Sequence, residues 1–227
     1  MKKLAYLFLL SFFFIIACEP PIVFTEPQPK KVKAETAFSE EYQGVYFCES
    51  DTSLVTVTEK GIYKEKDFYF TTTPEDISEM DDMYLENDEL IINWYFKPLK
   101  ITYLDDEHLS GVLTIRDTLF WISDNHVLKY YKGHQILNYN LGNKKWDIYV
   151  FSQDDYGNVS YMRTKLPENL EELEKITPVT NLSDKDKTQY QVSPTKMEFK
   201  KLLETQIIFE ECDYFERIGR KLEDDFG

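Results

Sequence analysis

The chain has 227 residues, of which 42% are hydrophobic, 15% aromatic and 30% charged. It carries 41 acidic residues against 26 Lys and Arg, and its formal net charge of −15 repels nucleic acid, so nucleic-acid binding is excluded. The 16 Tyr and 16 Phe, with only 8 Gly, favour β-sheet, and the length suffices for one globular domain.

The N-terminus has the pattern of an export signal. Lys2 and Lys3 precede an apolar segment, and the small Ala17 lies directly before Cys18. Ile15-Ile16-Ala17-Cys18 resembles the lipobox of bacterial lipoproteins. This resemblance implies that residues 1–17 are cleaved off and that Cys18 carries the lipid that anchors the mature protein to a membrane. An uncleaved signal anchor is the alternative, but the apolar segment is shorter than the about 20 residues that span a bilayer.

Residues 18–41 are expected to form a tether between the lipid and the folded domain. The segment contains four prolines and three lysines among few apolar residues: Pro20, Pro21, Pro27, Pro29, Lys30, Lys31 and Lys33. Such a composition buries too little apolar surface to become ordered. We therefore predict that folding begins at Tyr42.

Residues 44–162 alternate between apolar and other side chains with the period of β-strands. Two such sets are Leu90, Ile92, Trp94 and Phe96, and Trp146, Ile148 and Val150. Short polar turns between the strands favour antiparallel neighbours, because a parallel crossover needs about a dozen residues. We predict an antiparallel meander sheet that is barrel-like or sandwich-like.

After Met162 the pattern becomes helical. A first short helix is expected to begin at Pro167, with Leu170, Leu173 and Ile176 on its apolar face. A second follows Ser193-Pro194, where Thr195 and Glu198 have the spacing of a capping box. A closing strand is predicted at 214–218 and a frayed tail at 220–227. The fold class is therefore α+β and β-rich, with a single domain over residues 42–219.

Cys48 and Cys212 are the cysteines besides Cys18. An oxidising compartment permits a disulfide, and a loop of this length would stabilise the fold by roughly 5 kcal/mol. Against this, both cysteines have apolar or aromatic neighbours, as buried thiols do. We expect both thiols to be free.

The acidic stretch between Asp67 and Phe96 is the strongest functional candidate. It holds nine acids and no Lys or Arg. Clustered carboxylates suit Ca²⁺, a basic partner protein, or a solvated loop that prevents strand aggregation. We take five of them as candidate partner-binding residues: Asp81, Asp82, Glu86, Asp88 and Glu89.

No motif in the chain specifies a catalytic, cofactor or metal site. There is no Gly-x-Ser-x-Gly elbow and no glycine-rich phosphate loop. His108, His126 and His134 lack the spacing of zinc ligands. The aromatic strands leave one alternative: a small barrel could hold an apolar ligand, unless the same rings fill its core.

The chain as a whole resembles lipoproteins of Bacteroidota for which no activity is established. The likeness lies in four segments: Tyr42–Phe47, Asp117–Phe120, Tyr131–Asn138 and Ser193–Phe199. The residues after Cys18, Glu19-Pro20-Pro21-Ile22, depart from the surface-export signal of that phylum, which implies the periplasmic face of the outer membrane. The expected function is a non-catalytic protein-binding module of the cell envelope, with a lipocalin-like carrier of a small apolar ligand as the alternative.

Overall fold

A computed structural model describes residues 19–185 and 187–219. The signal peptide, Cys18 and the expected tail at 220–227 lie outside the described residues. Half of the chain is strand and a tenth is helix, so the predicted β-rich composition is confirmed.

Three helices and fifteen strands form the described part of the chain. In chain order they are β1 (Ile22–Phe24), β2 (Gly44–Cys48), β3 (Ser53–Val57), β4 (Gly61–Thr72), α2 (Pro74–Ser78), β5 (Met83–Glu86), β6 (Glu89–Ile92), β7 (Leu99–Tyr103), β8 (Leu109–Trp121), β9 (His126–Tyr131), β10 (His134–Gly142), β11 (Lys145–Gln153), β12 (Val159–Thr164), α3 (Leu170–Glu174), β13 (Val179–Asn181), β14 (Tyr190–Val192), α4 (Lys196–Thr205) and β15 (Phe209–Gly219).

The strands form one large open sheet. Its order is β13-β14-β1-β11-β12-β15-β2-β3-β4-β8-β7-β6-β5, with β10 on the other edge of β11 and β9 beyond it. Neighbours are antiparallel except β1 and β14, which are parallel.

The sequence allowed a barrel-like sheet, and a closed barrel is wrong. The described strands β8 and β9 follow one another in the chain but do not pair, so the sheet stays open. Side chains bridge this opening instead. The Tyr139 hydroxyl donates a hydrogen bond of 2.7 Å to the Leu119 carbonyl, and the Phe120 and Tyr139 rings meet edge to face at 5.3 Å.

Both faces of the central strands are covered. On β11, Phe151 belongs to the cluster inside the curved sheet, whereas Val150 packs on the opposite face with Phe199 and Leu202 of α4. Alternate side chains of β11 therefore pack in two different apolar clusters, and neither face of this strand is a solvent-exposed one.

The two predicted C-terminal helices are present. In α4 the capping box is confirmed, since the Glu198 N–H donates to the Thr195 hydroxyl and the Thr195 N–H donates to the Glu198 carboxylate. The first helix, α3, begins at Leu170 after the N-cap Asn169, rather than at Pro167. The predicted closing strand belongs to the longer β15.

The expected start of folding at Tyr42 is wrong. Ile22–Phe24 is fully buried as β1, between β11 and β14. Further along the segment, the buried Lys129 ammonium donates to the carbonyls of Pro27 and Pro29 at 2.8 and 2.9 Å. Three apolar residues and one buried cation thus order a segment whose composition suggested a tether.

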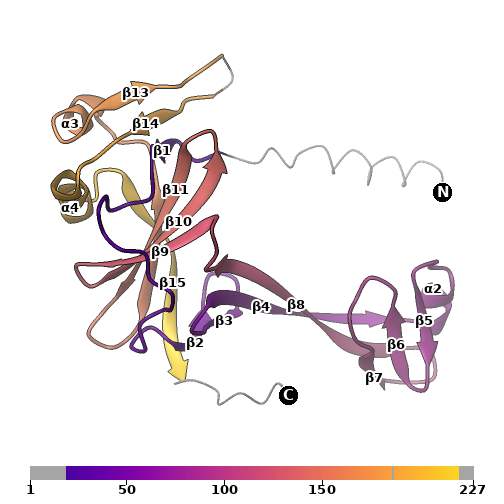
Figure 1. The fold of residues 1–227 in the computed structure, drawn as a ribbon. Helices are drawn as coiled ribbons and strands as arrows, with labels where there is room; N and C mark the ends of the chain where they lie inside the picture. Colours follow the sequence, from indigo (N-terminus) through magenta and orange to yellow (C-terminus); the bar gives the residue numbers. More distant parts are fainter. Residues whose placement is uncertain (1–18, 186, 220–227) are drawn as a thin grey trace.

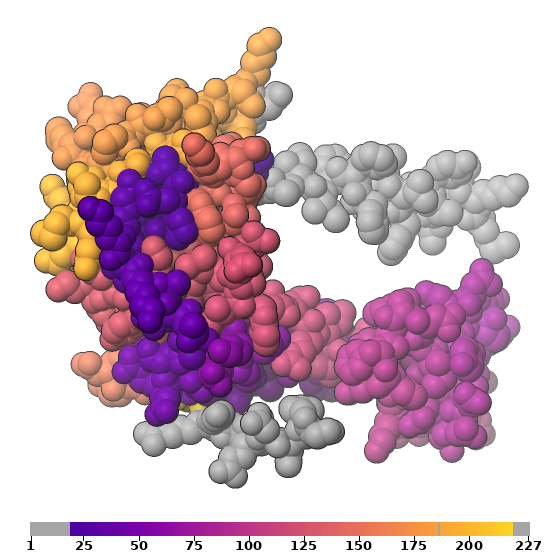
Figure 2. Space-filling view, in the orientation of Figure 1, coloured from indigo at the N-terminus to yellow at the C-terminus, as the bar shows by residue number. Residues whose placement is uncertain are grey.

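The longest strands, β4 and β8, form a two-stranded ribbon that leaves the body and ends in a small lobe made of α2, β5, β6 and β7 (Figure 1). Figure 2 shows this distal lobe, in magenta, standing apart from the body. It has its own apolar cluster: Ile77, Leu90, Ile92, Leu99 and Leu109. The strand expected up to Phe96 ends at Ile92.

The thiols of Cys48 and Cys212 are free, as predicted. Cys48 on β2 lies opposite Phe215 of β15, three residues beyond Cys212. The Cys212 thiol instead donates to the Tyr161 carbonyl at 3.0 Å.

Candidate docking surface on the distal lobe

The five candidate acids all lie on the distal lobe, at the two ends of the β5–β6 hairpin. Glu86, Asp88 and Glu89 surround its turn, where Asn87 and Asp88 have φ values of 50° and 60°, as a type I′ turn requires. Asp81 and Asp82 precede β5, and the Asp82 carbonyl accepts the Asn93 N–H at 2.9 Å. The strands between have four residues, so the two groups lie about 13 Å apart. The structure therefore gives two small clusters along one hairpin.

The distal lobe concentrates the negative charge of the chain. Residues 67–115 hold twelve acids and two lysines, a formal charge of −10 out of −15 for the whole chain. Among the described residues, none of the five candidate acids forms an ion pair within the protein. A field of one sign, with carboxylates that have no internal partner, attracts cationic ligands and steers their approach.

Large aromatic side chains are also exposed within residues 67–115. Tyr69 and Phe96 are each 80% exposed and Trp94 is 61% exposed. Tyr95 lies between the last two and is held in place, since its hydroxyl donates to the Thr114 carbonyl at 2.6 Å. The sequence pattern had assigned Trp94 and Phe96 to a strand face, and no local signal distinguishes such a strand from the exposed turn seen here.

A groove of about 600 Å³ opens where β7 begins beside β8. Its lining includes Tyr69, Tyr95, Lys97, Lys100 and Gly111, and no acid. A Cβ at Gly111 would come within 2.5 Å of the Phe70 ring, so a larger residue here would displace that ring. Lys97 and Lys100, the two lysines of residues 67–115, therefore both line this acid-free groove.

The body holds a row of aromatic rings that crosses the curved sheet, with the Cys212 thiol packed beside it. Centroid distances are 5.3 Å from Tyr139 to Tyr149 and 4.9 Å from Tyr149 to Tyr161. Burial raises the pKa of the nearby Cys212 thiol to about 11 and that of Tyr149 to about 12. Both groups are therefore protonated at neutral pH, when they are weak nucleophiles.

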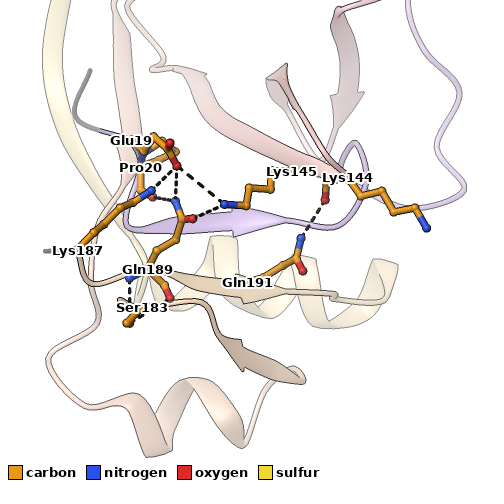
Figure 3. A network of polar contacts seen from close by, with 8 residues as sticks. All are labelled: Glu19, Pro20, Lys144, Lys145, Ser183, Lys187, Gln189 and Gln191. Atoms are coloured by element: carbon orange, nitrogen blue, oxygen red, sulfur yellow. Dashed lines mark hydrogen bonds and ion pairs between the residues drawn. The ribbon is translucent and has the colours of Figure 1, made fainter. Parts of the chain in front are cut away.

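The body also fixes the first described residue, Glu19, in a polar network (Figure 3). The Glu19 carboxylate accepts hydrogen bonds from Lys187 and from the Gln189 amide, and the Lys187 hydrogen bond lowers the pKa of Glu19. The buried Gln189 also donates to the Pro20 carbonyl at 2.9 Å and accepts from Lys145 at 2.8 Å. The chain is thus attached to the β13–β14 loop and the β10–β11 turn from Glu19 onward.

The three histidines lie in separate places. His108 contacts Asp105, His126 contacts the Trp121 carbonyl, and His134 contacts the Ser152 hydroxyl. Within the described ranges, no group of three or more His, Cys, Asp or Glu residues has the geometry to hold a metal ion. None of the helices in those ranges is long and apolar enough to cross a membrane.

Comparisons with known proteins found no matching family model, no matching curated protein and no matching solved structure.

Proposed function

We propose that the protein is a cell-envelope lipoprotein that binds a basic partner protein through its distal lobe. The observation that carries this proposal is the combination, on one projecting lobe, of a formal charge of −10 with aromatic rings up to 80% exposed. Exposed aromatic side chains supply contact area at low entropic cost. The acids of the same lobe favour a partner that carries positive charge.

The anchor is the second part of this proposal. A lipid on Cys18 would adjoin Glu19, which the Lys187 and Gln189 contacts attach to the body. The link between lipid and body would then be one residue, about 3.8 Å long, instead of the tether that the composition suggested. Such an attachment holds the body close to the bilayer, on the periplasmic face of the outer membrane, and leaves the lobe to project.

The carrier alternative loses its main support. A lipocalin-like carrier binds its ligand inside a closed barrel, whereas this sheet is open and its inward rings pack against one another. A small ligand would instead have to occupy the lobe groove beside Lys97 and Lys100. Native mass spectrometry of the lipoprotein extracted from its own membranes distinguishes a retained small ligand from a retained polypeptide.

The docking proposal is tested by neutralising the candidate acids. The test variant is Asp81→Asn, Asp82→Asn, Glu86→Gln, Asp88→Asn and Glu89→Gln. The control changes five exposed acids of the body that form no ion pair with any described residue: Glu40→Gln, Glu49→Gln, Asp155→Asn, Glu168→Gln and Glu174→Gln. Both variants change the net charge by five, so only position differs.

In cross-linking on native membranes, the lobe variant should lose most of the partner captured by the wild type, and the control should retain it. Equal capture by the wild type and both variants would reject the lobe as the docking surface. Equal loss from both variants would mean that the net charge, rather than the lobe, attracts the partner.

A further inference from the structure

One edge of β4 has no strand partner within the described part of the chain. β4 pairs with β8 along its whole length, from Gly61 to Thr72, but with β3 only from Ile62 to Glu65. The ribbon between body and lobe is therefore two strands wide, and from residue 66 to residue 72 the second edge of β4 is open.

The hydrogen-bond register identifies which backbone groups face this open edge. The Thr58 N–H donates to the Gly61 carbonyl at 2.8 Å, which closes the β3–β4 hairpin and turns Gly61 toward β3. Because backbone groups in an antiparallel strand alternate between its two edges, residues 63 and 65 also face β3. By the same alternation the N–H and C=O groups of Asp67, Tyr69 and Thr71 face the open edge.

The other strand of the ribbon supports this assignment independently. The Thr114 carbonyl accepts a hydrogen bond from the Tyr95 hydroxyl on the edge of β8 that lies away from β4. The backbone N–H and C=O of Thr114 therefore face away from β4. Asp67 lies opposite Thr114 in the β4–β8 ladder, so the backbone N–H and C=O of Asp67 must face away from β8. Apart from the ladder with β8, no hydrogen bond to the backbone N–H or C=O of Asp67, Tyr69 or Thr71 exists within the described residues.

Beyond Lys66 and Asp67, the open edge lacks the features that usually protect an exposed strand. Natural edges are protected by charges, proline, bulges or a covering element. Residues 68–73 read Phe-Tyr-Phe-Thr-Thr-Thr, without charge, proline or glycine, and with strong β propensity. Phe68 is 45% exposed, and Tyr69 is the most exposed ring of the ribbon. An unprotected edge of this kind is suited to pairing with another extended chain.

We propose that the edge of β4 from Asp67 to Thr72 accepts an extended, basic segment of the partner protein as an added strand. This inference rests on the proposed docking function and specifies how the partner binds, by strand addition. Backbone hydrogen bonds to Asp67, Tyr69 and Thr71 supply the pairing, and the acids of the lobe, including Glu75 and Asp76 directly beyond the strand, select basic side chains. A second copy of this chain fits less well, because edge-to-edge pairing would bring together two lobes of formal charge −10.

The first test uses a defined probe with the full mature chain. The probe is a capped decapeptide of alternating Lys and Val, and its control is the same peptide with all of its backbone nitrogens methylated, which has equal charge but cannot donate ladder hydrogen bonds from either edge. With the unmodified peptide, amide exchange at Asp67, Tyr69 and Thr71 should slow by at least about fivefold, the change that corresponds to one hydrogen bond of about 1 kcal/mol. Equal protection by both peptides, or protection confined to residues 81–89, would overturn strand addition.

The second test separates the backbone from the side chain. Tyr69→Ala and Tyr69→Pro both remove the ring, but only the proline removes the outward N–H. Because this N–H forms no bond to β8, the proline should leave the ribbon ladder intact, as proline does on edge strands. Tyr69→Pro should bind the decapeptide at least about fivefold more weakly than Tyr69→Ala. Equal affinity of the two variants would refute the inference.

Two further measurements keep the test decisive. If Tyr69→Pro alters amide exchange in the lobe core, Thr71→Pro and Thr71→Ala replace the pair.

If capture of the native partner depends on the five candidate acids but not on the proline, strand addition fails while the docking function stands. If capture depends on neither, the docking function fails. A doubled mass of the protein alone in light scattering, abolished by Tyr69→Pro, would assign the edge to a second copy and overturn the proposal.

Discussion

Asp147 offers the sharpest test of the energetics of this fold, through the substitution Asp147→Asn. The residue lies on β11 opposite Tyr139, and it is only 9% exposed. Within the described residues its carboxylate accepts a single hydrogen bond, from the Ile148 N–H at 2.9 Å, and it forms no ion pair. Burial raises the pKa of Asp147 to about 6, and the Ile148 hydrogen bond offsets this only in part.

The sign and size of the effect follow from linkage. An aspartate in the unfolded chain has a pKa of about 3.9, so the folded state binds the proton more tightly by about two pKa units, or about 3 kcal/mol. This contribution is fully present below about pH 4 and is lost as the pH rises toward about 6. Above that pH, folding must bury the charge. Asparagine keeps an acceptor for the Ile148 N–H without the charge, so Asp147→Asn should be more stable than wild type at pH 7.5 by about 1–3 kcal/mol.

The measurement is urea unfolding at pH 4, 5.5 and 7.5, with exposed Asp155→Asn as the control. The stability advantage of Asp147→Asn should grow across these three values and be near zero at pH 4. An advantage that is independent of pH would show that repacking, rather than the buried charge, is responsible. No advantage at pH 7.5 would refute the reasoning altogether.

Three other predictions concern the remaining buried features. Lys129→Met leaves the Pro27 carbonyl without its donor and the Pro29 carbonyl with only the Val32 N–H at 3.4 Å; we expect a loss of about 2 kcal/mol in urea unfolding and faster proteolysis at residues 25–33. Gly111→Val would clash with Phe70; hydrogen exchange should accelerate in the lobe cluster by the equivalent of about 1–3 kcal/mol and remain unchanged in the body. Because Cys48 and Cys212 are free, a reducing agent should shift the melting temperature by less than about 1 °C, whereas a drop of several degrees would indicate a disulfide.

Features with local causes could be predicted from the sequence. The capping box of α4 requires only Thr195, Glu198 and the apolar residues that follow, all within one turn. The alternation over Trp146–Val150 likewise predicts β11, because the period of a strand is visible in five residues.

Features that depend on distant partners could not be predicted. β1 has three apolar residues, too few for a periodic signal, and it is ordered by β11 and β14, more than a hundred residues away. The exposure of Trp94 and Phe96 depends on where the hairpin ends. The acidic candidates themselves were visible in the sequence, but their division into two clusters depends on the β5–β6 register.

The separation of charge within the molecule connects its architecture to its proposed role. Without Lys2 and Lys3 of the proposed signal peptide, the formal charge outside residues 67–115 is −17 − (−10) = −7, and Lys145 and Lys187 neutralise Glu19 beside the proposed lipid site. The six residues of β4 that precede this acidic unit, Gly61 to Lys66, span about 20 Å, more than twice the Debye length of about 8 Å at physiological ionic strength. The negative field of the lobe is therefore screened before it reaches the anchored end. In the proposed anchorage, anionic headgroups would not repel the anchored end through this field. In the proposed role, the ribbon separates the anchored end, which approaches the membrane, from the acidic lobe, which attracts the basic partner.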